Sequence, residues 1–260
     1  MPFAPRSVAV LEGRPGWATF APHPALAPHV SAYWTVEFRG RRHVIRTLPD
    51  ACIDVTVDLA GGLSAYIAGP QKRAKNRTLR GHVHLVGARL LPGSARLLGA
   101  RLDELDEDWT PLSRFVKTSE VRRLEARLRR AASLSERIGC LEAFLLDKLL
   151  NHAVDPRLSR ALQLVYEAEG DLAVSRLAGE VRVSLRTLVR LFETWVGLSP
   201  KRFVRVVRFQ SALRALERPA SGADLAARLG YSDQAHFIRD VRELFGATPS
   251  EVLRLAPDTR

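Results

Sequence analysis

The C-terminal part of the chain contains one helical pattern twice, and this duplication constrains the fold more than any other feature. In each copy a short apolar segment leads through a tight turn to a Ser that can cap the next helix, which is typical of a helix-turn-helix. The equivalent positions are Leu177-Ala178 and Leu225-Ala226, Ser184 and Ser232, Arg190 and Arg239, Gly197 and Gly246, and Ser199-Pro200 and Thr248-Pro249. We therefore predict two helix-turn-helix motifs.

The second helix of each motif has an apolar side and a polar side. In the first copy the apolar stripe is Leu188, Leu191, Phe192 and Trp195, opposite Arg186, Val189, Arg190 and Glu193. In the second copy the apolar residues are Phe237, Val241, Leu244 and Phe245, with Ala235, Arg239 and Arg242 facing out and Gln234 and His236 on the flank. Arg and Gln side chains can form paired hydrogen bonds with base edges in the major groove. Each helix thus presents a face that can read DNA.

The second copy also ends in a defined way. Gly246 stops its helix, Thr248 caps a following helix, Pro249 occupies the first turn of that helix, and Glu251 completes a capping box. This turn chemistry fixes the direction in which the chain leaves the motif.

These residues carry a resemblance to a known family. The stretch "LAARLGYSDQAHFIRDVRELFGATPSEVL" resembles the second helix-turn-helix of the AraC/XylS transcriptional regulators, and "LAGEVRVSLRTLVRLFETWVGLSPKRFVRVVRFQSAL" resembles their first motif and linking helix. The resemblance spans roughly residues 155–255. It implies two recognition helices, joined by a long helix, that enter successive major grooves on one face of double-stranded DNA. The DNA-contacting positions that it implies are Ser184, Arg186, Thr187, Val189, Arg190, Ser232, Gln234, Ala235, His236 and Arg239.

Three positions depart from the family pattern, namely Arg182, Ile238 and Asp240, and of these Ile238 could contact a thymine methyl group. Arg182 stands where the first turn often has Gly, at a position that can require a positive φ. Asp240 is an unusual neighbour of Arg239, because its carboxylate would repel phosphate if it faced the DNA backbone.

The N-terminal part has a different pattern. Short alternating runs such as "CIDVTVDL" and "HVHLVGARL" lie between Pro and Gly turns and read as strands. Together with "HVSAYWTVEF" and "VGARLLPGSA", they are similar to a sensor-type domain that precedes AraC-type DNA-binding domains. That similarity implies a β-rich barrel or cupin-like module, and an α+β protein overall. We expect a sensor domain at residues 1–115, a helical linker at 116–153, and a DNA-binding domain at 154–260.

The linker reads as two amphipathic helices. A Ser133/Glu136 capping box opens the second helix, and apolar residues recur at helical spacing along both, namely Leu124, Leu128, Ile138, Leu141, Leu145 and Leu149. This surface predicts either a homodimer interface or docking onto the barrel. As the covalent connection, the linker is also expected to transmit a signal from the sensor to the DNA reader.

The expected signal is a small-molecule effector bound inside the barrel. Trp34, Cys52, Tyr66 and His84 lie on separate strand-like runs, and alternating side chains of a closed barrel can line one pocket. A register slip of one residue would reverse which side chains face inward.

Catalytic readings have less support. His82 and His84 share one face of a strand, but no carboxylate or third His follows at suitable spacing, so we expect no metal and no cofactor. Cys52 lacks the zinc-cysteine cluster of an alkyl acceptor and reads as a small buried hydrophobe. We expect no catalytic residues and a protein that is not an enzyme. The alternative is an enzyme or alkyl-acceptor domain fused to a DNA-binding module.

Composition sets the cellular context. The 260 residues carry a net charge of +12, but residues 155–260 contain 17 basic and 13 acidic residues, so most of the excess lies earlier in the chain. Charge alone therefore does not decide between nucleic-acid binding and a solvated surface. With two Cys and no apolar run long enough for a signal peptide or membrane span, we expect a cytoplasmic protein. RNA polymerase is a further expected partner.

Overall fold

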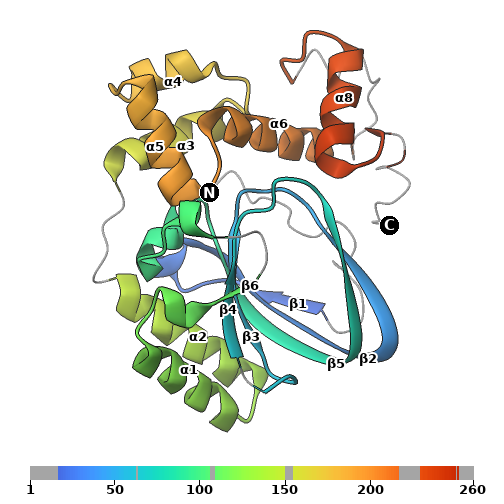
Figure 1. Ribbon diagram of the computed structural model, residues 1–260, viewed down its shortest axis with the longest axis vertical. Coiled ribbons are helices and arrows are strands. Elements are labelled where there is room, and N and C mark those ends of the chain that lie inside the picture. The colour runs from blue at the N-terminus through green and yellow to red at the C-terminus, as the bar shows by residue number, and fades with distance from the viewer. Residues whose placement is uncertain are drawn as a thin grey trace.

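The chain folds into an N-terminal unit built on a β-sheet and a C-terminal unit made of helices (Figure 1). This computed structural model describes residues 17–62, 64–105, 109–149, 155–216, 229–249 and 251. The predicted α+β class is confirmed. Leu225-Ala226 of the second repeat lies outside the described residues.

The sheet contains six antiparallel strands in the order β1-β2-β5-β3-β4-β6. Their bounds are β1 Trp17–Phe20, β2 Val30–Thr47, β3 Ile53–Asp58, β4 Ser64–Ala68, β5 Lys75–Leu90 and β6 Trp109–Pro111. The long strands β2 and β5 pair along their whole length and curve strongly (Figure 1). Among the described strands, β1 and β6 are the two edge strands of the sheet, and they do not pair with each other. The β-rich prediction is confirmed, with strand curvature rather than barrel closure forming the concave face.

The main core of the N-terminal unit lies between one face of the sheet and two helices, α1 (Thr118–Arg130) and α2 (Leu134–Leu149). Strand alternation sends Val55, Val57 and Val86 to this face, where they meet the helices. Of the apolar linker residues, Leu124, Leu128, Ile138, Leu141 and Leu145 are buried in this core and Leu149 is half-buried against it. The apolar linker surface is therefore docked onto the sheet, which is the second of the two alternatives drawn from the sequence.

Four short 3₁₀ helices connect these elements: η1 Pro24–Leu26, η2 Ser94–Leu98, η3 Leu102–Glu104 and η4 Leu112–Arg114. Two of them, η2 and η3, lie on the side of the unit that meets the C-terminal helices. The Ser133/Glu136 capping box is present, because Ser133 Oγ accepts a hydrogen bond from Glu136 N at 3.2 Å.

The C-terminal unit contains α3 (Pro156–Glu167), α4 (Val174–Glu180), α5 (Leu185–Val196), α6 (Pro200–Leu216) and α8 (Gln234–Phe245). The long helix α6 contributes to two hydrophobic clusters. Phe203 packs edge to face with Phe192 of α5, while Phe209 packs with Phe237 and Phe245 of α8. The two halves of the repeat therefore share α6 as a common support. Within the described part of the chain, no helix combines the length and apolarity needed to cross a membrane.

Candidate nucleic-acid interface and ligand cavity

The first repeat forms a turn and a capped helix as its sequence predicts. Ser184 Oγ accepts a hydrogen bond from Thr187 N at 3.1 Å, so Ser184 caps α5. Arg182 has a positive φ of 53°, which explains why glycine suits this position. Gly197 ends the helix in the left-handed conformation. On α5, Arg186 and Arg190 are exposed, Thr187 and Val189 are half-buried, and Leu188, Leu191 and Phe192 are buried.

The second repeat differs from the prediction at its helix cap. The cap of α8 is Asp233 rather than Ser232, and Asp233 Oδ1 accepts a hydrogen bond from His236 N at 2.7 Å. Ser232 instead contacts the cap, with its Oγ 3.1 Å from Asp233 Oδ2 and 3.2 Å from His236 Nδ1. The physical reason is one extra residue between the turn glycine, Gly230, and the start of the helix. Since Asp caps as well as Ser does, the helix begins at the carboxylate.

Asp240 does not lie on the exposed side of α8. Its side chain is buried, forms an ion pair with Arg205 of α6, and accepts a hydrogen bond from the Tyr231 hydroxyl at 3.2 Å. Arg205 also pairs with Glu243 at 2.7 Å. Burial and the neighbouring Asp240 raise the pKa of Tyr231, which keeps its hydroxyl protonated as a donor. The unusual acidic residue therefore fixes α8 to α6 instead of approaching phosphate.

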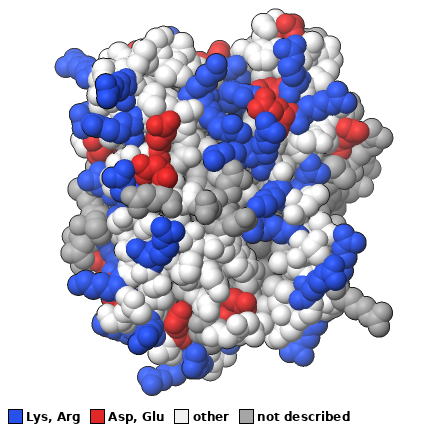
Figure 2. All heavy atoms as spheres, viewed as in Figure 1, with Lys and Arg blue, Asp and Glu red and all other residues white. Residues whose placement is uncertain are grey.

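The starts of both recognition helices are directed away from the sheet (Figure 1). At their C-terminal ends, Gly197 of α5 abuts Pro70 and Gly246 of α8 abuts Arg46, both from the N-terminal unit. On α8, Gln234, Ala235 and Arg239 are exposed and His236 is half-buried. The exposed predicted residues are therefore accessible on both helices, and Arg190 of α5 also lines a groove together with Lys72 and Arg101 of the N-terminal unit. Figure 2 shows that Lys and Arg are spread over both units, so charge does not mark this side alone.

Comparison with known proteins identifies the C-terminal unit. A helix-turn-helix domain matches residues 177–255, and a domain of unknown function (DUF6597) matches residues 18–108. A transcriptional regulator of the HTH type from Haemophilus influenzae is 28% identical over 44% of this chain and 44% of its own. The C-terminal unit is an AraC-type helix-turn-helix domain. The chain spans less than half the length of the curated relatives first found similar to it.

Two further similarities each cover part of the chain. A probable thc operon regulatory protein of Rhodococcus erythropolis is 35% identical over 35% of this chain and 28% of its own. The solved structure of a Chromobacterium violaceum transcriptional regulator with an AraC-type DNA-binding domain is 28% identical, with a TM-score of 0.38, over 40% of this chain and 96% of that chain.

The concave face of the sheet holds a cavity of about 100 Å³. Of the four residues predicted to line an effector pocket, Trp34 and Cys52 line this cavity. Tyr66 is on the same face but stacks on Trp109, which is the residue that lines the cavity. His84 is on the opposite, helix-covered face, because it lies two residues from the core residue Val86 and contacts Arg137 of α2. The structure therefore brings together two of the four, and strand parity excludes His84.

A polar network forms one wall of the cavity. Arg89 pairs with Asp50 and, at 2.9 Å, with Asp54, while Asp54 accepts a hydrogen bond from Trp34 Nε1 at 2.9 Å. Burial alone would lower the pKa of Arg89, but the two carboxylates raise it, so the guanidinium stays charged. Local sequence does not reveal this network, because its members come from β2, β3, β5 and the turn before β3.

The Cys52 thiol lies inside this wall. Burial raises its pKa, and the carboxylate of Asp50 raises it further. A thiol in this setting stays protonated and is a poor nucleophile. The prediction of a buried small side chain is confirmed by its exposed fraction of 3%.

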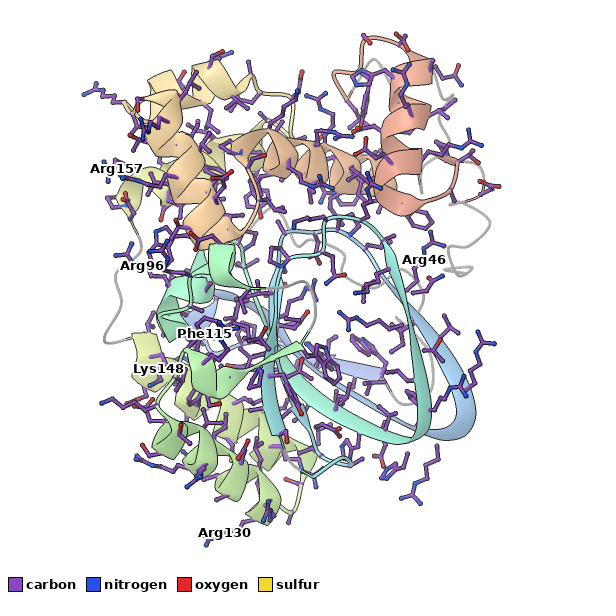
Figure 3. All side chains as sticks on the ribbon, viewed as in Figure 1. Arg46, Arg96, Phe115, Arg130, Lys148 and Arg157 are labelled. Atoms are coloured by element: carbon purple, nitrogen blue, oxygen red, sulfur yellow. The ribbon has the colours of Figure 1, made fainter. Side chains whose placement is uncertain are left out.

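The same wall borders the AraC-type domain. Leu48, a cavity residue, packs with Phe209 and Phe245, and Pro49 O accepts a hydrogen bond from Gln210 Nε2 of α6 at 2.7 Å. Nearby, Arg46 donates to Phe245 O and lies over its ring at 4.3 Å. Figure 3 shows Arg46 and Arg96 at opposite ends of the boundary between the units. Local sequence does not reveal this contact, because its partners lie far apart along the chain.

Proposed function

We propose that the protein is a sequence-specific DNA-binding transcription regulator whose binding to double-stranded DNA responds to a small-molecule effector. The observation that carries the proposal is the pair of capped 12-residue helices, α5 and α8, whose starts are both directed away from the sheet (Figure 1). The division into residues 1–115, 116–153 and 154–260 is part of this proposal.

The exposed polar residues of the two helices take distinct roles. Arg186, Arg190 and Arg239 read guanine edges, and Gln234 reads adenine, because these side chains match the paired groups that those bases present in the major groove. Val189 and Ala235 contact base surfaces. The remaining members, Ser184, Thr187, Ser232 and His236, lie at helix starts, where hydroxyl, imidazole and backbone N–H groups bind phosphate.

Base readout is tested by selecting binding sites from random DNA with the full chain and with variants. Arg190→Ala and Arg239→Ala should each cost on the order of 1–3 kcal/mol on the selected site and relax the base preference at one position. Arg127→Ala, on the exposed side of α1, is the matched control and should change neither. Unchanged base preference in the Arg190→Ala/Arg239→Ala double variant would refute the assignment.

The cavity is the proposed effector site. Trp17, Trp34 and Trp109 make much of its wall, and two buried donors, Trp17 Nε1 and Arg89 Nε, have no hydrogen-bond partner among the described residues. A small, largely apolar ligand that carries a hydrogen-bond acceptor would satisfy these donors and cover the indole rings. Of the four pocket residues predicted from the sequence, Trp34 and Cys52 support this proposal.

Three of the four tryptophans line the cavity, so intrinsic fluorescence reports on its occupancy. A panel of small aromatic and aliphatic acceptors should include compounds that change the fluorescence and the DNA affinity over the same concentration range. Ala68→Leu, which adds a side chain to the cavity wall, should remove both responses while leaving DNA binding in place. Ligands that alter DNA affinity equally in Ala68→Leu and in the unchanged chain would place the effector elsewhere.

The proposal also concerns enzyme activity, cellular location and protein partners. Its relatives are transcriptional regulators, and the raised pKa of Cys52 disfavours the alternative of an alkyl-acceptor or enzyme domain, so we propose a protein that is not an enzyme. Cytoplasmic location, contact with RNA polymerase and homodimerisation remain proposals from the sequence. A homodimer would need a surface other than the α1–α2 leucines, which are packed against the sheet.

A further inference from the structure

The helix-covered face of the sheet gathers three side chains that bind transition metals. His82 and His84 lie two residues apart on β5, and Glu37 on β2 pairs in register with His84. Side chains at such positions project from one face of a sheet. The sequence contained no third ligand near the two histidines, because the carboxylate arrives from a strand 45 residues away in the chain.

The ligand atoms are already close together. His82 Nε2 lies 3.2 Å from Glu37 Oε1, and His84 Nδ1 lies 3.9 Å from Glu37 Oε2. All three ligand atoms lie within 4.8 Å of one another. Around a tetrahedral zinc ion with bonds of about 2.0–2.2 Å, neighbouring ligand atoms are separated by roughly 3.4 Å. Small side-chain rotations on two paired strands would bring the set to that spacing.

We propose that Glu37, His82 and His84 form a site for a borderline divalent transition metal such as Zn²⁺, Co²⁺ or Ni²⁺. Two imidazoles and one carboxylate favour these ions over Mg²⁺ and Ca²⁺, which prefer oxygen ligands. Glu37 and His82 side chains are 48% and 41% exposed, so ions reach the site from solvent and water completes the coordination.

The site is linked to helix α2 through Arg137. Arg137 Nη1 lies 3.5 Å from His84 Nε2, and since a guanidinium only donates, His84 Nε2 accepts and the neutral ring carries its proton on Nδ1. Metal binding at Nδ1 moves that proton to Nε2, which then no longer accepts from Arg137. The ion therefore competes with the Arg137 contact, and Arg137→Gln should bind metal more tightly than the unchanged chain.

The test uses the full chain without a histidine tag, freed of metal with a chelator and titrated with ZnCl₂ by calorimetry and with CoCl₂ by visible absorption. One ion per chain is expected. Glu37→Gln, His82→Ala and His84→Ala should each weaken binding by at least about tenfold, as loss of a ligand does more than the loss of an outer-shell partner. His23→Ala removes an exposed histidine outside the cluster and should leave binding unchanged.

Glu37 and His82 are substantially exposed, so their variants keep the fold and give a clear result even if His84→Ala is destabilised. Absence of binding at micromolar zinc would overturn the proposal. So would binding that persists unchanged in both Glu37→Gln and His82→Ala, because the ion would then be held elsewhere.

Discussion

The two recognition units have the same local plan but are fixed to the rest of the molecule in different ways. The first unit, α4 and α5, meets η2 and η3 through side-chain packing, with Arg96 over the Trp195 ring at 4.8 Å. The second unit, α8 with its turn, is held by the buried Asp240 and Arg205 ion pair and by Arg46. Both units therefore pack apolar side chains against α6, and the second adds a buried ion pair and the Arg46 contact.

Their distance from the cavity also differs. The strand end and turn that hold α8, Arg46 to Cys52, include the cavity residues Leu48, Asp50 and Cys52. None of the residues that line this cavity comes from α5. A ligand that shifts the cavity wall at Leu48 would therefore act on the packing of the second unit, whereas the first unit borders the wall at Pro70, between Gly69 and Gln71. This contact supplies a route that bypasses α1 and α2, which were expected from the sequence to carry the signal.

The largest expected effect is the loss of a buried apolar side chain from the first unit. Phe192 is fully buried between α5 and α6, and Phe192→Ala should lower the free energy of unfolding by about 3–5 kcal/mol. Urea denaturation monitored by circular dichroism measures the loss. Because the lost contacts are apolar, the decrease in the free energy of unfolding should be nearly the same in low and high salt. A difference that shrinks strongly with salt would contradict the apolar attachment of the first unit.

The next largest effect is expected from removing the buried ion pair of the second unit. Asp240→Asn keeps the shape of the side chain but removes the charge that pairs with Arg205, which should cost about 2 kcal/mol. DNA footprints should then lose the half contacted by α8 and keep the half contacted by α5. Leu191→Met, at the equivalent position of α5, is the control and should retain both halves. Equal loss of both halves would show that the units do not behave separately.

The two units also differ in how much of each could be predicted. Ser184, Arg182 and Gly197 act within a few residues of their own turn, so spacing and residue type were sufficient to predict the first unit. Ser232 failed as a cap because one inserted residue moved the helix start, and spacing alone does not show where an insertion falls. The role of Asp240 depends on Arg205, 35 residues earlier, which pairs with it only after α6 and α8 pack.

The cavity shows the same limit on a larger scale. Alternation along the strands predicted a sheet with two faces, but Tyr66 and His84 could be assigned to a face only once the pairing register was known. The contact between Pro49 and Gln210 joins residues 161 positions apart, for which no local pattern exists. Local chemistry therefore predicted the helices of the two repeats better than it predicted the cavity and its contact with the second repeat.

A smaller effect is expected at the boundary between the units. Arg46→Met removes the hydrogen bond to Phe245 O and the contact with its ring, while keeping an apolar side chain of similar length. The coupling between ligand and DNA should fall by up to about 2 kcal/mol, within the usual range for coupled sites. Arg96→Met, which removes the corresponding ring contact of the first unit, should leave the coupling intact. If Arg96→Met abolished the response and Arg46→Met did not, the signal would run through the first unit.

The smallest expected effect is a pH dependence of the second unit that the first unit lacks. Hydrogen bonds from the backbone N–H of His236 and from the side-chain hydroxyl of Ser232 lower the pKa of Asp233 from its ordinary value of 3.8. When folding lowers the pKa of a carboxyl group, the charged carboxylate stabilises the folded state. This stabilisation is complete at a pH above the pKa of the unfolded chain and is lost as the pH falls through the pKa of the folded chain. The cap of α8 should therefore weaken below about pH 4, whereas Ser184, with no charge to lose, caps α5 at any pH. Hydrogen exchange of the first-turn amides, corrected for intrinsic rates, should show α8 losing protection before α5 on acidification. Asp233→Ser should remove that difference, and an identical loss of protection in both helices of the unchanged chain would mean that the two caps are not chemically distinct.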